Sequence, residues 1–198
     1  MFLSTLLAAT LAALVPKAKA TELYYPTTEG TKRVMRTKSE DGASNEVTIT
    51  VTKVEEKEGT FTVTTTREVS GQRSEFRNEV SAKGVFSLPR SGEKGEPRAA
   101  LKLPAKEGDT WATEQPASGN RAGWTTKHTV GKEEEVEVPA GKFKAIVVTA
   151  EYELDGIAYK STAWYAVGIG VVKSVSVSNR TERMQELKEF TPGKDAKK

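Results

Sequence analysis

The sequence contains no cysteine among its 198 residues. A chain without thiols forms no disulfide, and it cannot ligate an iron–sulfur cluster or a thiolate zinc ion. It also has no cysteine nucleophile for covalent catalysis. Stability outside the cytoplasm must therefore come from the packing of the chain alone.

Histidine is almost as scarce, because His128 is the single one. A metal site with several histidine ligands is excluded. The acidic run at residues 133–135 does not converge on one ion, because successive strand residues point to opposite faces. One histidine still permits a Ser-His-Asp triad, but the sequence has no Gly-x-Ser-x-Gly nucleophile motif. We expect no catalytic residue, metal or cofactor, and a hydrolase that uses His128 is the weakest alternative.

Long apolar runs are missing after residue 20. The run from Leu3 to Val15 is too short to cross a bilayer, and Ala18-Lys19-Ala20 follows it with the small-x-small pattern of a signal-peptidase site. We predict that residues 1–20 are a signal peptide cleaved after Ala20; the alternative is a buried N-terminal helix or strand. The mature chain would then have no transmembrane span and would lie in the periplasm or outside the cell.

The sequence also lacks a strong excess of charge of one sign. The whole chain has 30 basic and 27 acidic residues. Removal of residues 1–20 takes away Lys17 and Lys19 and no acid, which leaves 28 basic against 27 acidic residues. Such a balance provides no basic surface for nucleic acid and no basic run for a membrane. We therefore expect neither partner.

The clearest structural signal is a long β-hairpin within residues 138–177. Asp155-Gly156 fits a two-residue type I′ turn, whose backbone requires positive φ angles. Apolar and aromatic side chains dominate one face, with the predicted pairs Leu154–Ile157, Tyr152–Tyr159, Ala150–Ser161, Val148–Ala163 and Ile146–Tyr165. The opposite face receives the pairs Glu151–Lys160, Thr149–Thr162 and Val147–Trp164. A slip of one residue would expose the apolar set, so the register should be well determined.

The rest of the chain alternates polar and apolar residues between turn signals about ten residues apart, which is typical of antiparallel strands. We predict an all-β fold of 10–12 short strands in a single curved antiparallel sheet, half-barrel or sandwich. One β domain should span residues 21–190, followed by a flexible charged tail at residues 191–198. Residues 183–190 fit either a last strand or a short helix.

A short pattern occurs twice in the chain. Pro26, Glu29 and Gly30 match Pro104, Glu107 and Gly108 at a constant offset of 78 residues. Proline fixes φ before a turn, and glycine adopts backbone conformations that other residues avoid. The pattern indicates the same strand–turn–strand unit used twice, and it suggests a two-fold internal repeat.

Two tryptophans stand out as binding candidates. Trp164 and Val147 lie on the hairpin face opposite the main apolar set, so another strand layer, a loop or a ligand must cover them. Trp111 lies in the second copy of the repeated pattern. We predict that Trp111, Trp164 and Val147 contribute to a ligand-binding surface, and packing within the fold is the alternative.

Three motifs in this order resemble a known family: Pro104-x-x-x-Gly108-x-x-Trp111, residues 138–145 (VPAGKFKA), and the segment from Trp164 to Lys173. Together they are similar to exported bacterial proteins labelled TapB-like, over residues 23–190. The resemblance implies a curved antiparallel β-sheet protein of the periplasm or cell exterior, and it carries over no catalytic residue. The first copy of the repeat departs from the pattern, since Arg33 stands where the second copy has Trp111.

These observations predict an exported, non-enzymatic β protein of the bacterial cell envelope. We expect it to bind an apolar ligand, such as a lipid, or an envelope protein on a concave sheet face. The alternative is a purely structural or interaction module of the envelope with a filled core.

Overall fold

The computed structural model describes residues 22–40, 42–90, 92–93, 95–117, 122–179 and 181–194. The predicted signal peptide and its cleavage site after Ala20 lie outside these residues, as do residues 195–198 of the predicted tail. The described residues form strands and no helix, which confirms the all-β prediction. The thirteen strands are β1 (Lys32–Ser39), β2 (Ser44–Lys57), β3 (Thr60–Val69), β4 (Gln72–Ser81), β5 (Gly84–Ser87), β6 (Arg98–Lys102), β7 (Thr110–Gln115), β8 (Trp124–Val130), β9 (Glu134–Val138), β10 (Gly141–Leu154), β11 (Ile157–Ala166), β12 (Gly170–Ser178) and β13 (Thr181–Thr191).

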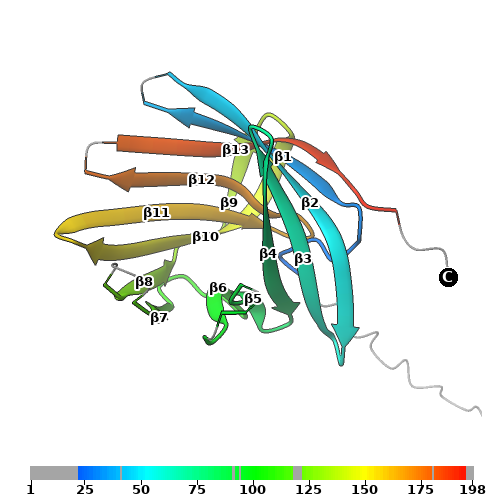
Figure 1. The fold of residues 1–198 in the computed structure, drawn as a ribbon, viewed down its shortest axis with the longest axis horizontal. Helices are drawn as coiled ribbons and strands as arrows, with labels where there is room; N and C mark the ends of the chain where they lie inside the picture. The colour runs from blue at the N-terminus through cyan, green and yellow to red at the C-terminus, as the bar shows by residue number, and fades with distance from the viewer. Residues whose placement is uncertain are drawn as a thin grey trace, which may run out of the picture.

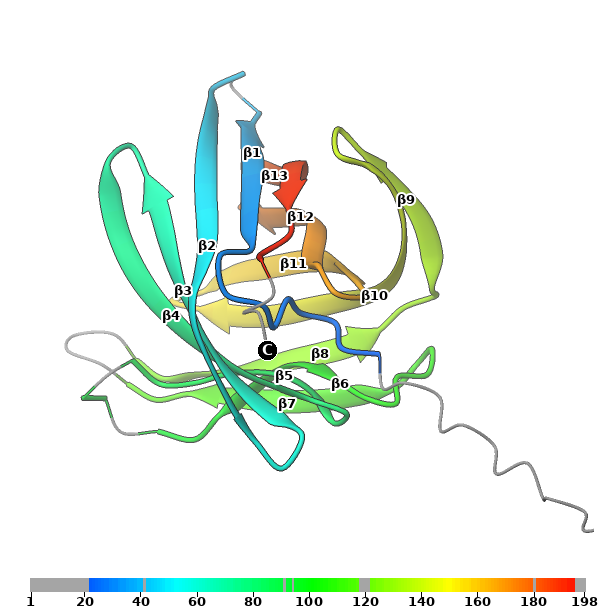
Figure 2. The same cartoon turned by 90° about the vertical axis from the view of Figure 1, so that its right-hand side faces the viewer.

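All strands belong to one antiparallel sheet in the order β6-β5-β4-β3-β2-β1-β13-β12-β11-β10-β8-β7, with β9 paired to β10 outside this path. The sheet curls into a half-open barrel (Figures 1 and 2). The predicted single curved sheet is confirmed, with one strand more than the predicted upper count. The segment 183–190 is a strand, because β13 pairs with both β1 and β12.

The predicted hairpin is formed by β10 and β11, and every predicted pair occurs in the observed register. Asp155 and Gly156 have φ angles of 52° and 74°, as a type I′ turn requires. The neighbouring ladder is irregular between Trp164 and Tyr165, where β12 carries an extra residue opposite β11. Such a bulge bends a strand and increases its twist, which helps the sheet to curl.

The sheet contains two copies of one meander. Strands β1 to β6 are neighbours in the sheet in consecutive order, and so are β7, β8 and β10 to β13. Strand β9 is an additional strand in the second copy. The Gly30 amide donates to the Val51 carbonyl over 2.8 Å, and the Val51 amide donates back to the residue after Gly30. In the same way the Gly108 amide donates to the Val130 carbonyl, and the Val130 amide donates back to Asp109, both over 2.9 Å. The repeat suggested by the sequence is thus present in the backbone hydrogen bonds.

The two junctions between these halves differ. Strands β1 and β13 are joined by a ladder that runs from Lys32–Thr191 to Ser39–Arg183. Strands β6 and β7 approach each other without a ladder among the described residues. We call this junction the seam. Side chains connect it instead: the Trp111 indole and the Arg98 guanidinium donate hydrogen bonds across it.

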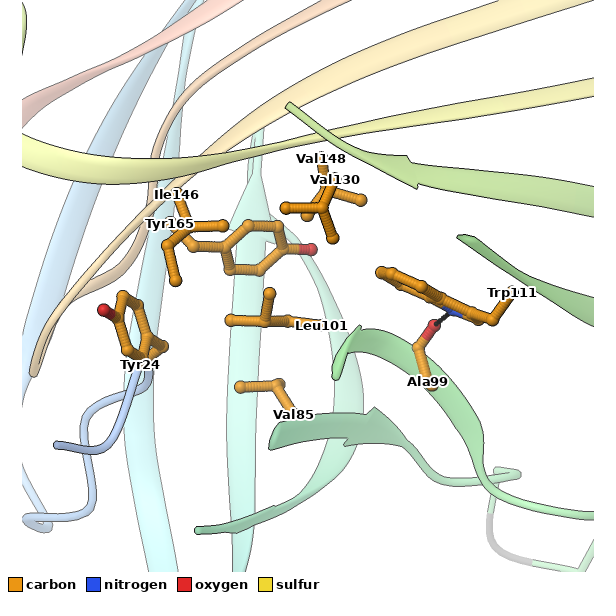
Figure 3. Packing of buried hydrophobic residues seen from close by; sticks show 9 residues of the cluster. All are labelled: Tyr24, Val85, Ala99, Leu101, Trp111, Val130, Ile146, Val148 and Tyr165. Atoms are coloured by element: carbon orange, nitrogen blue, oxygen red, sulfur yellow. Dashed lines mark hydrogen bonds between the residues drawn. The ribbon is translucent and has the colours of Figure 1, made fainter. Parts of the chain in front are cut away.

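Apolar side chains pack on both faces of the β10–β11 hairpin at the end far from its turn. The first core contains Ile146 and Tyr165 and is shown in Figure 3. Ala145 and Ala166 point to the opposite face and belong to a second core with Val136 of β9. Strand β9 also packs near β12 and β13, so this part of the chain covers the hairpin face that Trp164 shares. The buried residues of the second core are Met35, Val47, Val136, Val138, Ala145, Ala166, Val172 and Leu187.

Candidate functional site

The inner face of the β10–β11 hairpin changes character along its length. Ile146 and Tyr165 are buried in the first core, whereas Tyr152 and Tyr159 are half-buried near the turn. Between these levels lies the small pair Ala150 and Ser161. Small side chains fill little space, so a hollow of about 450 Å³ opens here on the concave side of the sheet. We call it the serine hollow; its lining residues are Arg67, Tyr152, Tyr159, Lys160, Ser161, Ser174, Ser176, Val177, Ser178, Thr181, Arg183 and Gln185.

Strand β12 gives the serine hollow its polar floor. Ser174, Ser176 and Ser178 alternate with valines, and all three serines line the hollow. Val175 alternates with these serines and therefore points to the other face. In most half-buried strands the apolar side chains point inward, so β12 is reversed. The Ser176 hydroxyl lies 3.1 Å from the hydroxyl of Ser161 on β11, which links the two strands within the floor.

An aromatic column borders the serine hollow. The Tyr152 and Tyr159 rings stack with centroids 4.7 Å apart and an interplanar angle of 6°, and Trp124 stacks on Tyr152 at 5.5 Å. The column thus spans β8, β10 and β11. Ser178 lies across from Tyr159 on β12, and its side chain is too small to cover the second face of the Tyr159 ring. Burial, together with the neighbouring Tyr159 phenol, raises the pKa of Tyr152.

The charges that line the serine hollow have one sign. Arg67, Lys160 and Arg183 contribute cationic groups, and none of the lining residues that the structure describes carries a carboxylate. The ammonium of Lys160 is already paired with Glu151 over 2.9 Å. Neither arginine makes an ion pair with the residues that the structure describes. Guanidinium groups bind carboxylates and phosphates with charge-assisted hydrogen bonds, so the hollow is suited to an anionic ligand.

A larger groove of about 710 Å³ lies along the seam. Phe86, Ala99 and Trp124 give it apolar surface, but its charged lining is mixed: Glu93, Glu96, Arg98, Lys102 and Glu114. Opposite charges can satisfy one another across such a groove. The serine hollow is therefore the better candidate site, because its charges have no partner of opposite sign in the lining.

The three residues predicted to bind a ligand lie in two places. Val147 and Trp164 are cross-strand partners on the hairpin face opposite the first core. The Trp164 indole donates to the Glu134 carboxylate over 2.7 Å, and the Lys173 ammonium lies 5.5 Å from its ring centroid. Trp111 is 8% exposed within the first core, so the structure does not bring it together with the other two. A ligand-binding role for these residues stays a prediction.

His128 lies beside Trp111 on the inner face. Its ring stacks on the Trp111 indole at 5.0 Å with an interplanar angle of 4°, and its Nε2 lies 2.9 Å from the Thr113 hydroxyl. Burial and the nearby Lys102 ammonium lower the pKa of His128. In the described part of the chain, no cluster of three or more histidine, cysteine, aspartate or glutamate residues could hold a metal ion.

One further signal in the sequence points to the hollow. Residues 173–178 read Lys-Ser-Val-Ser-Val-Ser, with a hydroxyl at every second position. This alternation predicts a strand with one polar face. It does not tell which face points inward, because that depends on strands distant in the sequence.

The fold and its hollow define a half-open β-barrel protein with an internal polar site. The chain belongs to the DUF3108-like family, whose profile matches residues 26–188. The family is thereby shown, whereas the TapB-like label stays a prediction. No curated protein matches the chain. Within the residues that the structure describes, no helix is long and apolar enough to span a membrane.

Two solved structures share the fold. A proposed lipoprotein of Parabacteroides distasonis has a TM-score of 0.59 and 13% identity, covering 87% of this chain and 100% of its own. A proposed exported protein with a YmcC-like fold, from Bacteroides fragilis, has a TM-score of 0.57 and 15% identity, covering 86% of this chain and 99% of its own. At such low identity the likeness concerns the fold alone.

Proposed function

We propose that this protein is an exported, non-enzymatic binding protein of the cell envelope and that it holds a ligand in the serine hollow. The observation that carries the proposal is the hollow itself. It lies on the concave side of the sheet, beyond a filled apolar core and beside an aromatic column. Concave sites with a few convergent polar groups are the usual places where proteins bind small molecules.

The lining changes the kind of ligand that we expect. The sequence favoured an apolar ligand, but serines from β11 and β12 form much of the serine hollow. Ser161 and Ser176 bond to each other, but a purely apolar molecule would leave the other hydrogen-bonding groups of the floor unsatisfied, which costs free energy. A ligand with polar groups of its own satisfies them, and the aromatic column packs against its less polar part.

Export is supported by two independent observations. The first twenty residues have the length and the small-residue pattern of a signal peptide. Two structural neighbours are described as a proposed lipoprotein and a proposed exported protein. We therefore place the mature chain in the periplasm or outside the cell.

The proposal is tested on protein purified from the envelope of the native organism. Native mass spectrometry should give a chain that begins at Thr21 and a second species with a bound small molecule. Ser176→Phe would fill the serine hollow and should remove the bound species. Val175→Phe adds the same ring to the opposite face of β12 and should retain it. Circular dichroism establishes that both variants fold.

Two results would overturn this function. The first is wild-type protein that carries no small molecule when taken directly from the envelope. The second is a bound molecule that is retained equally by Ser176→Phe and Val175→Phe. A crosslinked envelope protein in place of the small molecule would instead support an interaction module, which was the alternative drawn from the sequence.

A further inference from the structure

We propose that the ligand of the serine hollow is an acidic saccharide, a sugar chain that carries carboxylate groups. This inference rests on the proposed function and names the chemical class of its ligand. Three features of the hollow carry it: two arginines without ion-pair partners, a floor of hydroxyl groups, and an aromatic ring that is paired with a small serine on one side.

The arginines supply the preference for an anion. Arg67 comes from β3 and Arg183 from β13, so they reach the serine hollow from two different parts of the sheet. Arg67 is half-buried and shares its strand face with the buried Thr65. A partly buried guanidinium without a counterion is stabilised when a carboxylate enters, since the charge-assisted hydrogen bond is stronger in a less polar environment.

The floor supplies the preference for hydroxyl groups. Serine side chains both donate and accept hydrogen bonds, and so do the hydroxyls of a sugar. Gln185 donates to the Thr37 hydroxyl over 2.9 Å, which fixes its amide at the base of the hollow. The floor offers a row of such groups on β11, β12 and β13. A molecule with several hydroxyls matches this row better than a simple carboxylic acid does.

The aromatic column supplies the contact for a sugar ring. The face of an aromatic ring is negative, and the C–H groups on the flat side of a sugar are weakly positive, so the two pack favourably. Tyr152 stacks on one face of Tyr159, and on the other side Tyr159 is paired with Ser178, whose small side chain leaves room for a sugar ring. A sugar ring placed there would have its hydroxyls over the serine floor.

The experiment is isothermal titration calorimetry on the purified mature chain. The probes are trigalacturonate, which has three acidic rings, maltotriose, which has three neutral rings, and citrate, which has carboxylates and no ring. Trigalacturonate should bind at least about tenfold more tightly than either control, because only it satisfies both the arginines and the floor. Polygalacturonate is the fourth probe, and it shows whether the sugar can be part of a longer envelope glycan.

Variants separate the two contributions. The double change Arg67→Gln and Arg183→Gln should weaken trigalacturonate by about tenfold or more and leave maltotriose unchanged. Tyr159→Ala should weaken both saccharides. Arg73→Gln is the matched control, because Arg73 is an exposed arginine outside the hollow that is paired with Glu68. This control should bind like the wild type.

Three outcomes would overturn the inference. Equal binding of citrate and trigalacturonate would show a site for anions in general, and equal binding of maltotriose would show that the arginines do not select. Absence of saccharide binding at millimolar concentration would exclude the ligand class. If envelope-purified protein still carried a small molecule that Ser176→Phe removes, the proposed function would stand without this ligand. If it carried none, both would fail.

Discussion

The indole Nε1 of Trp111 donates a hydrogen bond of 2.9 Å to the carbonyl oxygen of Ala99 and so connects β7 to β6 across the seam. The other junction between the two halves is a ladder of eight residue pairs between β1 and β13. At the seam a side-chain hydrogen bond from a buried residue thus joins strands that backbone hydrogen bonds join at the other junction. Trp111 therefore connects the two ends of the sheet, as the Arg98–Gln115 hydrogen bond also does.

Replacing this indole should therefore weaken the seam. Trp111→Phe retains an aromatic ring but leaves the Ala99 carbonyl without its donor, which should lower the free energy of unfolding by about 1–3 kcal/mol. Urea unfolding measures the change. Trp164→Phe is the control, because its hydrogen bond to Glu134 is exposed to solvent and water can replace it. Equal losses in the two variants would contradict a special role for Trp111.

The Asp155-Gly156 turn gives a second prediction. Gly156 has a φ angle of 74°, and an added methyl group would meet no atom within 4 Å. Gly156→Ala should therefore cost only the backbone strain of the left-handed region, about 1–2 kcal/mol. Asp155→Asn should be nearly neutral, because asparagine tolerates this region. Thermal unfolding compares the two; a neutral Gly156→Ala would contradict the strained turn.

The buried phenol of Tyr165 gives a third prediction, about alkaline pH. Burial raises the pKa of Tyr165 from 10.0 to about 12. Between these values the unfolded chain loses this proton and the folded chain keeps it. The contribution of Tyr165 to the free energy of unfolding is therefore fully present below pH 10 and is lost as the pH rises through about 12. Denaturant unfolding across this window should show the decline. Tyr165→Phe should make it shallower, and an unchanged slope would contradict the assignment.

The stacked histidine gives a fourth prediction, about acid. Because the pKa of His128 is lowered from 6.5, the unfolded chain binds its proton first as the pH falls. Stability should therefore decline below pH 6.5, until the folded pKa is reached. His128→Gln should remove this part of the pH dependence, which unfolding curves at several pH values would detect. The same variant tests the hydrolase alternative, since loss of a hydrolytic activity in His128→Gln would argue against a binding protein.

Local sequence pattern determined much of the β10–β11 hairpin. The alternation of apolar and polar residues and the Asp155-Gly156 turn fixed its register, because both act between residues that are close along the chain. The repeated turn with Gly30 and Gly108 was also visible, since positive φ angles favour glycine wherever they occur.

Other properties were set only when distant strands met. The alternation in β12 predicts a serine face and a valine face, but curvature of the whole sheet placed the serines inside. Trp111 is a candidate ligand contact in the sequence, and in the structure it is buried because the two ends of the sheet meet around it.

The serine hollow shows the same division. Its serines come from neighbouring strands, whereas Arg67 and Arg183 are separated by more than half of the chain. The sequence by itself determined the strands, the turns and the hairpin register, because these depend on local sterics and alternation. Only the tertiary structure decided which faces became the inside of the barrel, because closure of the sheet joins strands from both halves of the repeat.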